Sequence, residues 1–570
     1  MAGSGQNHLC LLPVFALDHW NPGGIMKDIY YNAVIYVKRG MYVSAIGVEN
    51  GRIGALGDRA DMEAWVKEDP AVWHDLEEGF VAPGFVDSHM HLLEYGYGLT
   101  TVDLASATSS MASVLDRVSE YMAAHEEARG GWIVGRGWNH DYFQDEKRFP
   151  NRYDLDRVTG DRPVILFRAC GHVACVNSAA LAAAGITGDR PQPEGGCFDV
   201  DGKGEPTGVL REYGINMVSR IIPSPGKEEI KEYILTAMKK LNAYGITSVQ
   251  SDDLEAFPGV SYEAVLEAYR ELESQGLMTV KVYEQCLLSG MDTLRDFVSK
   301  GYRTGAGNRF FTIGPLKVFT DGSLGARTAF LSRPYADDAE NPDNCGISIY
   351  RQEELDEKIC FASEHGLQVA VHAIGDRAMD MTVRAFEKAG TAKGGNRLRH
   401  GIVHCQITTK ELLKKFQELD LHAYVQSIFL DYDNHIVEDR LGKERAADTY
   451  QFKTLLDMGV DVSNGSDAPV ENPHVLAGIQ CAVTRTTLDG SRIFLPDQAL
   501  SIEEALETYS SIGARASFEE EEKGRLLPGM TADFTVLAED LRYCRPERIK
   551  DVKVYRTFVD GICVFDGSCP

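Results

Sequence analysis

Several features are missing from this 570-residue sequence. Its twelve cysteines are scattered, with no CxxC pair, which argues against a disulfide scaffold and against a thiolate zinc site. No apolar run reaches the ~18 residues of a membrane span. The N-terminus also lacks the basic segment that begins a signal peptide. We therefore expect a cytoplasmic protein with reduced thiols and no membrane contact.

Basic charge is also in short supply. The chain has 58 Lys and Arg against 85 Asp and Glu, a formal net charge of −27. An acidic chain repels phosphate backbones, so we expect no nucleic-acid partner. Hydrophobic residues make up 44% and charged residues 25%, which excludes a disordered, collagen-like or coiled-coil chain. The charge itself indicates solubility and nothing more about fold or chemistry.

Short strand-like segments occupy both ends of the chain. Asn50-Gly51 and Asp560-Gly561 have the composition of hairpin turns between such segments. Two strand-rich ends around a different middle favour one small β-sandwich, which we expect from residues 26–82 and 500–570. Residues 1–25 are expected to be an arm outside the core.

The middle of the chain alternates between apolar strand-like runs and charged helical runs. This alternation predicts an α/β fold with parallel strands. The eight strand candidates are residues 80–89, 245–251, 279–285, 311–319, 368–374, 401–406, 422–427 and 461–467. Eight such strands predict a (β/α)8 TIM barrel, assigned to residues 83–95 and 241–499.

One gap in this pattern is too long for a single crossover. Residues 90–244 separate the first strand candidate from the second. We therefore expect an inserted capping domain after strand one, at residues 96–240. The charged, periodic segment 227–245 indicates a helix, and we expect it to belong to a helical core of this insert.

Polar residues gather at the carboxyl ends of the predicted barrel strands, where barrels carry their catalytic groups. Side chains alternate along a strand, so His89 and His91 share one face and form half of a zinc-like site. The later strands end in further candidate ligands, which are Lys317, His372, His404 and Asp467. Their convergence at one barrel mouth predicts a metal centre.

The motifs that contain these residues carry a family resemblance. They are PGFVDSHMH, LKVFTDGSLGARTAFL, VHAIGDRAMD, RHGIVHCQ and SNGSDAPVENPHVLAGI, supported by GRGWNHDYF, GHVACVNSAAL, TGVLRE and LPGMTADFTVL. Together they resemble the amidohydrolase superfamily, and within it amidohydrolase family 3, which includes N-substituted formamide deformylase-like proteins. The resemblance covers residues 26–570.

The resemblance implies a metal-dependent hydrolase on a barrel. By position, His89, His91, His372, His404 and Asp467 match the family's metal ligands. Lys317 occupies the fourth-strand position at which relatives can use a carbamylated lysine to bridge two metals. One or two divalent ions per chain are therefore expected, with zinc as the expected element. Val403 stands where the family usually has an acidic residue, and alternation along the strand should turn it away from the site.

We expect hydrolysis of a C–N bond in a small molecule, such as an amide or an N-substituted formamide. Metal-activated hydroxide would attack the carbonyl, and Asp467 would act as general base and then general acid. The same site would also suit a cyclic amidine deaminase, an esterase or a carbamate hydrolase. A catalytically inactive barrel that acts as a binding protein is a third interpretation.

Four further residues are candidates for substrate binding. Asp321 and Arg327 lie in the loop after strand four, and Arg327 would anchor a substrate carboxylate or a loop, or else pair with a local acid such as Asp321. The resemblance suggests that His172, in the insert, reaches the substrate. Trp138 would line an apolar pocket. The resemblance also suggests a homodimer.

Overall fold

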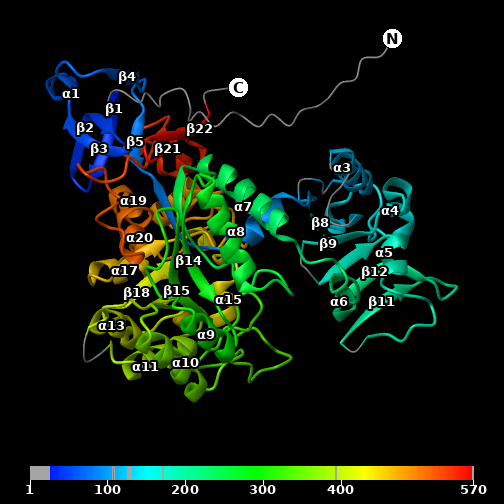
Figure 1. Ribbon diagram of the computed structural model, residues 1–570. Helices are drawn as coiled ribbons and strands as arrows, with labels where there is room; N and C mark the ends of the chain where they lie inside the picture. Colours follow the sequence, from blue (N-terminus) through cyan, green and yellow to red (C-terminus); the bar gives the residue numbers. More distant parts are fainter. Residues whose placement is uncertain are drawn as a thin grey trace, which may run out of the picture. The chain divides into compact units, whose positions relative to one another are not determined.

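The computed structural model describes residues 26–105, 107, 109–124, 131–169, 172–193, 195–391 and 395–567. The predicted arm, residues 1–25, lies outside this range. The chain divides into two compact units. The first comprises residues up to 92, residues 238–254 and residues 270 onward; the second comprises residues 93–237 and 255–269 (Figure 1). Among the described residues, no helix has the length and apolar character needed to cross a bilayer.

An eight-stranded, all-parallel sheet forms the core of the first unit and confirms the predicted barrel. Its strands follow chain order around the sheet, from β6 to β19. They are β6 (Phe85–Met90), β13 (Ile246–Ser251), β14 (Lys281–Leu287), β15 (Phe311–Phe319), β16 (Val369–Ala373), β17 (Gly401–His404), β18 (His422–Val425) and β19 (Val462–Asn464). Each falls on one of the eight segments that the sequence predicts.

Backbone hydrogen bonds bring the first and last strands of the barrel together. The Asp467 N–H donates to the His89 carbonyl at 2.8 Å, and the His91 N–H donates to the Ala468 carbonyl at 2.8 Å. These two bonds join the end of β6 to the segment after β19. The sheet is therefore nearly closed into a cylinder, with the carboxyl ends of all its strands at one mouth.

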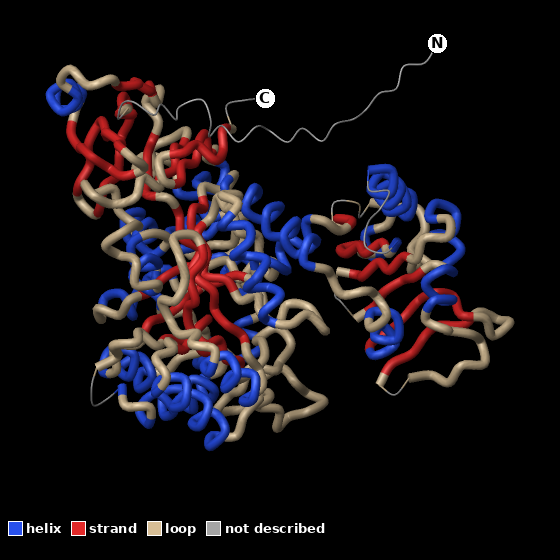
Figure 2. Tube along the Cα trace, viewed as in Figure 1, coloured by secondary structure: helices blue, strands red, loops and turns tan. Residues whose placement is uncertain are grey.

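Helices lie outside the barrel strands (Figure 2). The helix α11 shows why: its buried residues repeat at helical spacing, so one face is apolar and packs inward while its charged residues face outward. The α-helices that follow β14 in this unit are α9 (Met291–Ser299), α10 (Gln352–Glu364), α11 (Asp376–Lys388), α13 (Lys410–Glu418), α14 (Leu430–Asp433), α15 (Val437–Leu441), α16 (Lys443–Ala446), α17 (Phe452–Asp457), α18 (Val475–Thr484), α19 (Ile502–Thr508) and α20 (Ser511–Ala516). Single 3-10 turns add η3 (Ser427–Phe429) and η4 (Pro496–Gln498).

Both chain ends contribute to a second eight-stranded sheet in the first unit. Its order is β22-β21-β20-β5-β1-β2-β3, and β4 pairs with β1. Near Asn32, which has a positive φ, β1 changes partner from β4 to β5. The strands are β1 (Lys27–Lys38), β2 (Met41–Glu49), β3 (Arg52–Gly57), β4 (Ala71–Asp75), β5 (Phe80–Pro83), β20 (Phe534–Leu537), β21 (Val554–Val559) and β22 (Ile562–Asp566), with α1 (Arg59–Val66) and η5 (Pro546–Asp551). One cluster of buried residues, including Ile35, Ile46, Phe534 and Phe558, draws on both chain ends.

A buried ion pair fastens this sheet to the barrel. Lys281 begins β14, and its Nζ lies 2.6 Å from Asp533 Oδ2 and 2.9 Å from Asp560 Oδ1. Burial acts against the charge of the lysine, but the two carboxylates outweigh it and raise the pKa of Lys281. The C-terminal strands are thereby fixed to the third strand of the barrel.

The second unit is built on a six-stranded sheet of order β11-β12-β10-β9-β8-β7. The expectation of a helical core in this insert was therefore wrong, although α7 does cover most of the predicted helix. The strands are β7 (Val102–Asp103), β8 (Ile133–Trp138), β9 (Val164–Arg168), β10 (Val173–Val176), β11 (Gly196–Val200) and β12 (Pro206–Glu212). The helices are α2 (Leu92–Leu99), α3 (Met111–Ala124), η2 (His140–Tyr142), α4 (Arg152–Thr159), α5 (Ser178–Ala183) and α6 (Tyr213–Ser219), and α7 (Lys227–Asn242) and α8 (Tyr262–Ser274) have residues in both units.

Candidate metal centre

The six predicted ligands come together at the mouth of the barrel. His89 and His91 lie at the end of β6, and Lys317 lies near the end of β15. His372 is in β16, His404 ends β17, and Asp467 follows β19. All except His91 are nearly or completely buried. The strands of the barrel therefore deliver to one place side chains that are far apart in sequence.

His89, His91 and Asp467 form the first half of the centre. The Nε2 atoms of His89 and His91 lie 3.2 Å and 3.1 Å from Asp467 Oδ1. The three ligand atoms all lie within 4.8 Å of one another, a spacing that allows one metal ion to bind all three. This triad is a candidate site for a divalent metal.

His372 and His404 form the second half. His404 Nε2 lies 2.9 Å from His372 Nδ1. The His404 ring also lies against the His89 ring, with centroids 5.6 Å apart, so the two halves are adjacent. Lys317 lies beside the first half, with its Nζ 3.1 Å from His89 Nε2.

Three polar residues that the sequence analysis did not single out surround these ligands. Gln285 Oε1 lies 2.8 Å from His89 Nδ1, and Gln426 Oε1 lies 2.8 Å from His404 Nδ1. Asp252 offers its backbone oxygen to His91 Nδ1 at 3.2 Å and a carboxylate oxygen to Lys317 Nζ at 3.4 Å. Asp252 and Gln426 directly follow β13 and β18, and Gln285 lies two residues before the end of β14, so nearness to the carboxyl ends of the strands is the signal that could have identified them.

These contacts decide which nitrogen of each imidazole faces the centre. Gln285 Nε2 donates to the Ser88 carbonyl at 3.1 Å, which turns Gln285 Oε1 toward His89. An oxygen beside Nδ1 favours a proton on Nδ1, and the Nε2 of His89 faces Asp467 and Lys317 at the centre. The Asp252 carbonyl lies beside His91 Nδ1 in the same way, and the Gln426 amide lies beside His404 Nδ1, so the Nε2 atoms of His91 and His404 face the centre. His372 is reversed: its Nε2 faces the Gly322 carbonyl at 3.2 Å, and its Nδ1 faces the centre.

The donor set therefore suits a divalent cation. Four imidazole nitrogens and one carboxylate face the same volume, and nitrogen and oxygen donors of this kind are the ligands that divalent cations prefer. His372 and His404 show the convergence most directly, because His404 Nε2 and His372 Nδ1 face each other at 2.9 Å. Imidazole and carboxylate ligands in this number match zinc and related divalent ions.

The charges at the centre shift the pKa values of its members in opposite directions. Burial and the nearby Lys317 lower the pKa of His89 to about 4. Burial also acts against a charged His91, but the hydrogen bond to Asp467 and the charge of Asp252 prevail and raise the pKa of His91 to about 9. Burial would favour a neutral Asp467, yet its histidine partners hold the pKa of this carboxyl well below its usual value. Asp467 is therefore ionised at neutral pH.

Backbone strain coincides with the ligands. His404, Cys405 and Asp467 have φ angles of 80°, 51° and 58°. Residues with a side chain rarely adopt this left-handed region, which costs of order 1 kcal/mol or more and is concentrated at functional sites. The strain therefore supports a functional role for these strand ends.

Val403 points away from the centre, as strand alternation predicts. Its side chain is fully buried in a cluster with Ala370, Tyr424 and Ala516. Since neighbouring residues of a strand face opposite sides, the absence of an acid at this position leaves the ligand set unchanged.

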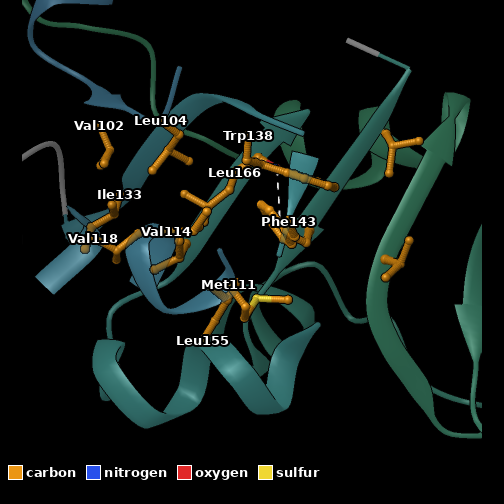
Figure 3. Packing of buried hydrophobic residues seen from close by; sticks show 14 residues of the cluster. Val102, Leu104, Met111, Val114, Val118, Ile133, Trp138, Phe143, Leu155 and Leu166 are labelled. Atoms are coloured by element: carbon orange, nitrogen blue, oxygen red, sulfur yellow. Dashed lines mark hydrogen bonds between the residues drawn. The ribbon is translucent and has the colours of Figure 1, made fainter. Parts of the chain in front are cut away.

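Three of the four predicted substrate-binding residues are held by contacts within the chain. Trp138 is completely buried in the core of the second unit and donates from Nε1 to the Leu166 carbonyl at 2.9 Å (Figure 3). It is therefore a core residue and cannot line a substrate pocket. Asp321 accepts from the N–H groups of Ile374 and Gly375, at 3.1 Å and 2.7 Å, so it organises the loop after β16.

Arg327 is engaged by a carboxylate of its own chain. It donates through two nitrogens to Asp337, at 3.0 Å and 2.9 Å, and not to Asp321. A guanidinium held in this way fixes its loop, which agrees with the predicted loop anchor and the predicted pairing with a local acid; contact of Arg327 with a substrate stays a prediction. His172 lies in the second unit, exposed and 2.9 Å from Glu212 Oε2, and its contact with substrate stays a prediction.

Comparisons with known proteins agree with this geometry. The family model described as "Amidohydrolase family" matches residues 73–565. YtcJ of Bacillus subtilis (strain 168) is 32% identical over 548 residues, covering 95% of this chain and 100% of YtcJ. N-substituted formamide deformylase of Arthrobacter pascens is 27% identical, covering 93% of this chain and 96% of that protein.

A solved structure shows the same fold. The crystal structure of an uncharacterized metal-dependent hydrolase from Pyrococcus horikoshii OT3 matches with a TM-score of 0.75 and 29% identity, covering 91% of this chain and 99% of that one. The family model and the similarity to YtcJ both extend over most of the chain. The chain therefore belongs to the amidohydrolase family, and its barrel is that of a hydrolase.

Proposed function

We propose that this protein is a metal-dependent hydrolase that cleaves the C–N bond of a small-molecule amide or N-substituted formamide. The observation that carries the proposal is the convergence of four histidines, Lys317 and Asp467 at one barrel mouth, with nitrogens of the histidines and the Asp467 carboxylate facing one another. The similarity to an N-substituted formamide deformylase supports the choice of substrate class.

His89, His91 and Asp467 would hold one ion, and His372 and His404 would hold a second. A divalent ion such as zinc, when bound there, polarises the substrate carbonyl and makes water a stronger nucleophile at neutral pH. Lys317 is completely buried, and burial lowers the pKa of its amine even though Asp252 opposes the shift. A lowered pKa increases the fraction of Lys317 in the neutral amine form, which is the form that carbon dioxide can carbamylate. The resulting carbamate would supply oxygen ligands between the two halves of the centre.

Asp467 is the proposed proton carrier. Its Oδ1 faces the histidine nitrogens, and the carboxylate is ionised at neutral pH. As a C–O bond forms between water and the carbonyl carbon, the carboxylate accepts the proton of the water. As the C–N bond breaks, the same proton passes to the leaving nitrogen, which departs as a neutral amine and leaves Asp467 ionised for another cycle.

A substrate screen on the metal-loaded protein tests this proposal. N-formyl amines, N-acyl amino acids, cyclic amides, cyclic amidines and esters would be supplied separately, with release of amine, ammonia or acid measured. Hydrolysis of the formamide or amide group is the expected result. Exclusive turnover of esters, or exclusive ammonia release from amidines, would show a different reaction at the same site. Failure to take up zinc or manganese, together with no turnover, would indicate a binding protein.

Labelled carbon dioxide tests the role of Lys317 separately. Protein loaded with metal in ¹³C-bicarbonate should show a carbamate carbon signal in NMR. The Lys317→Met variant should lack that signal and bind less metal. A signal of equal strength in the variant would exclude Lys317 as its source.

A further inference from the structure

A second polar cluster lies next to the metal centre. It consists of Gln406, two residues after the ligand His404, and Asp433, the last residue of α14. Gln406 Nε2 lies 3.5 Å from Asp433 Oδ2, so the amide group of Gln406 is directed at the Asp433 carboxylate. Both side chains are more than nine-tenths buried, with exposed fractions of 3% and 8%.

Helical geometry turns Asp433 toward the centre. The Phe429 ring stacks on the His404 ring, with centroids 6.0 Å apart and planes 16° apart. Residues 429–434 follow one another in helical turns, so Asp433, four residues after Phe429, lies on the same face. Asp433 therefore faces the side on which His404 lies.

The Asp433 carboxylate has no basic partner among the residues that the structure describes. Its Oδ2 accepts a hydrogen bond from the Tyr450 hydroxyl at 2.6 Å. The nearby guanidinium of Arg485 instead donates to the carbonyls of Phe494 and Tyr450, at 3.1 Å and 3.4 Å. Burial raises the pKa of Asp433 to about 6, while the Tyr450 hydrogen bond opposes the shift. At neutral pH the carboxylate is therefore mostly ionised, buried and without a cation, which is a costly arrangement.

Gln406 adds an unused acceptor to the same place. Its Oε1 is buried and has no hydrogen-bond partner in the structure. Neighbouring carboxylates add negative potential: burial raises the pKa of Glu471 to about 7, with contributions from Asp431, Asp433 and Asp467. An anion placed here would meet repulsion, whereas a cation with N–H donors would satisfy both acceptors.

We propose that Asp433 and Gln406 form a subsite beside the metal centre for a positively charged nitrogen group of the substrate, an ammonium or an amidinium. The inference rests on the proposed hydrolase function and narrows its substrate class to amides that carry such a group. Asp433 would accept the charge-assisted hydrogen bond, and Gln406 Oε1 would accept a second N–H.

Matched substrates test the subsite on the metal-loaded full-length protein. Three N-formyl alkylamines of equal chain length would end in an ammonium, a methyl or a carboxylate group. A hydrogen bond to a charged group predicts that kcat/KM for the ammonium compound exceeds that for the methyl compound by about 10- to 100-fold. The carboxylate compound should be the poorest substrate.

Substitutions test whether Asp433 and Gln406 cause the preference for the ammonium compound. Asp433→Asn keeps the shape of the side chain and can still form a hydrogen bond with Tyr450. The ratio of kcat/KM for the ammonium compound to kcat/KM for the methyl compound should therefore fall close to one. Gln406→Leu should lower the ratio in part. The matched control is Asp439→Asn, which removes one negative charge from an exposed position in α15 and should retain the full ratio. No preference in the native protein, or an unchanged preference in Asp433→Asn, overturns the proposal.

Equilibrium binding separates this proposal from the hydrolase proposal. Benzamidine and benzamide have nearly the same shape but differ in charge, and benzylamine tests an ammonium in place of an amidinium. Both cations should bind the metal-loaded protein more tightly than benzamide, and Asp433→Asn should remove the difference. If no formamide is hydrolysed but this charge preference is present, the subsite stands and the proposed reaction fails. If Asp433→Asn and Tyr450→Phe lower the melting temperature equally and binding does not change, Asp433 only supports Tyr450.

Discussion

The Nδ1 atom of His89 donates a hydrogen bond to the amide oxygen of Gln285 across 2.8 Å. Gln285 is not placed as a metal ligand, yet its amide oxygen decides which nitrogen of the His89 imidazole is free to bind a metal ion. The amide is itself fixed by its second hydrogen bond, to the Ser88 carbonyl. The orientation of the first metal ligand therefore depends on a residue from the third strand of the barrel.

Replacing Gln285 should weaken metal binding without removing a ligand. The Gln285→Leu variant loses the acceptor for His89 Nδ1, and loss of such a supporting contact typically costs about 10- to 100-fold in metal affinity. Gln285→Glu keeps an acceptor and should retain more affinity. Competition with a chelator measures both, with Gln417→Leu as an exposed control. Equal affinity in Gln285→Leu and the native protein would contradict the positioning role.

The Asp467→Asn variant tests proton transfer. The amide cannot accept the proton of the attacking water, so turnover should fall about 10²- to 10⁴-fold. The neighbouring histidines remain, so metal content measured by elemental analysis should stay near the native value. Near-normal turnover would exclude the proposed role. Metal loss in proportion to activity loss would instead assign Asp467 as a ligand alone.

The ion pair of Lys281 should contribute strongly to stability. Lys281→Met leaves the buried carboxylate of Asp533 without its lysine, whereas Asp560 keeps Arg309 at 2.7 Å, and loss of one buried partner costs about 3–5 kcal/mol. Urea denaturation measures the change. Arg384→Met, which breaks the exposed pair with Asp380, should cost about 1 kcal/mol or less. An equal decrease in the free energy of unfolding in both variants would show that the buried Lys281 ion pair stabilises the fold no more than an exposed one.

Buried histidines should make the fold sensitive to mild acid. The Val369 N–H donates to His400 Nδ1 at 2.9 Å, which fixes the neutral imidazole, and burial lowers the pKa of His400 to about 4 from 6.5. The unfolded chain therefore binds the proton more readily than the folded one between these values. Stability supplied by neutral His400 is full above about pH 6.5 and is lost as the pH falls toward about 4.

Substitution isolates this contribution. His400→Leu cannot titrate, so its unfolding free energy should vary less steeply with pH between about 6.5 and 4 than that of the native protein. His365→Leu changes an exposed histidine and should leave the slope as it is. An identical slope in the native protein and His400→Leu would contradict the assignment.

The barrel and its ligands were predictable because both follow simple periodic rules. Eight apolar runs mark the strands, and His89 and His91 share a face because strand side chains alternate. Trp138 was assigned wrongly because a large aromatic residue in a short motif suits a pocket and a core equally well. The sheet of the second unit was missed because it mixes parallel and antiparallel pairs, so its strands do not alternate regularly with helices.

The supporting contacts required the three-dimensional structure. Gln285 and Gln426 belong to a residue type that seldom binds metals, and their importance arises from the histidine nitrogen that each faces. Arg327 has several acids within reach along the chain, and only the loop conformation selects Asp337. Long-range pairing of this kind leaves no periodic trace in a sequence.

The seam between β6 and the segment after β19 has a consequence for synthesis on the ribosome. The peptide groups of Asp467 and Ala468 hydrogen-bond to those of His89 and His91, so ligands separated by most of the chain are joined through their own backbone. Translation proceeds from the N-terminus, and the nascent chain carries its first two histidines long before Asp467 leaves the ribosome. The complete donor set therefore forms only when the last barrel strand docks against the first. A truncated chain that stops before this strand cannot assemble that set.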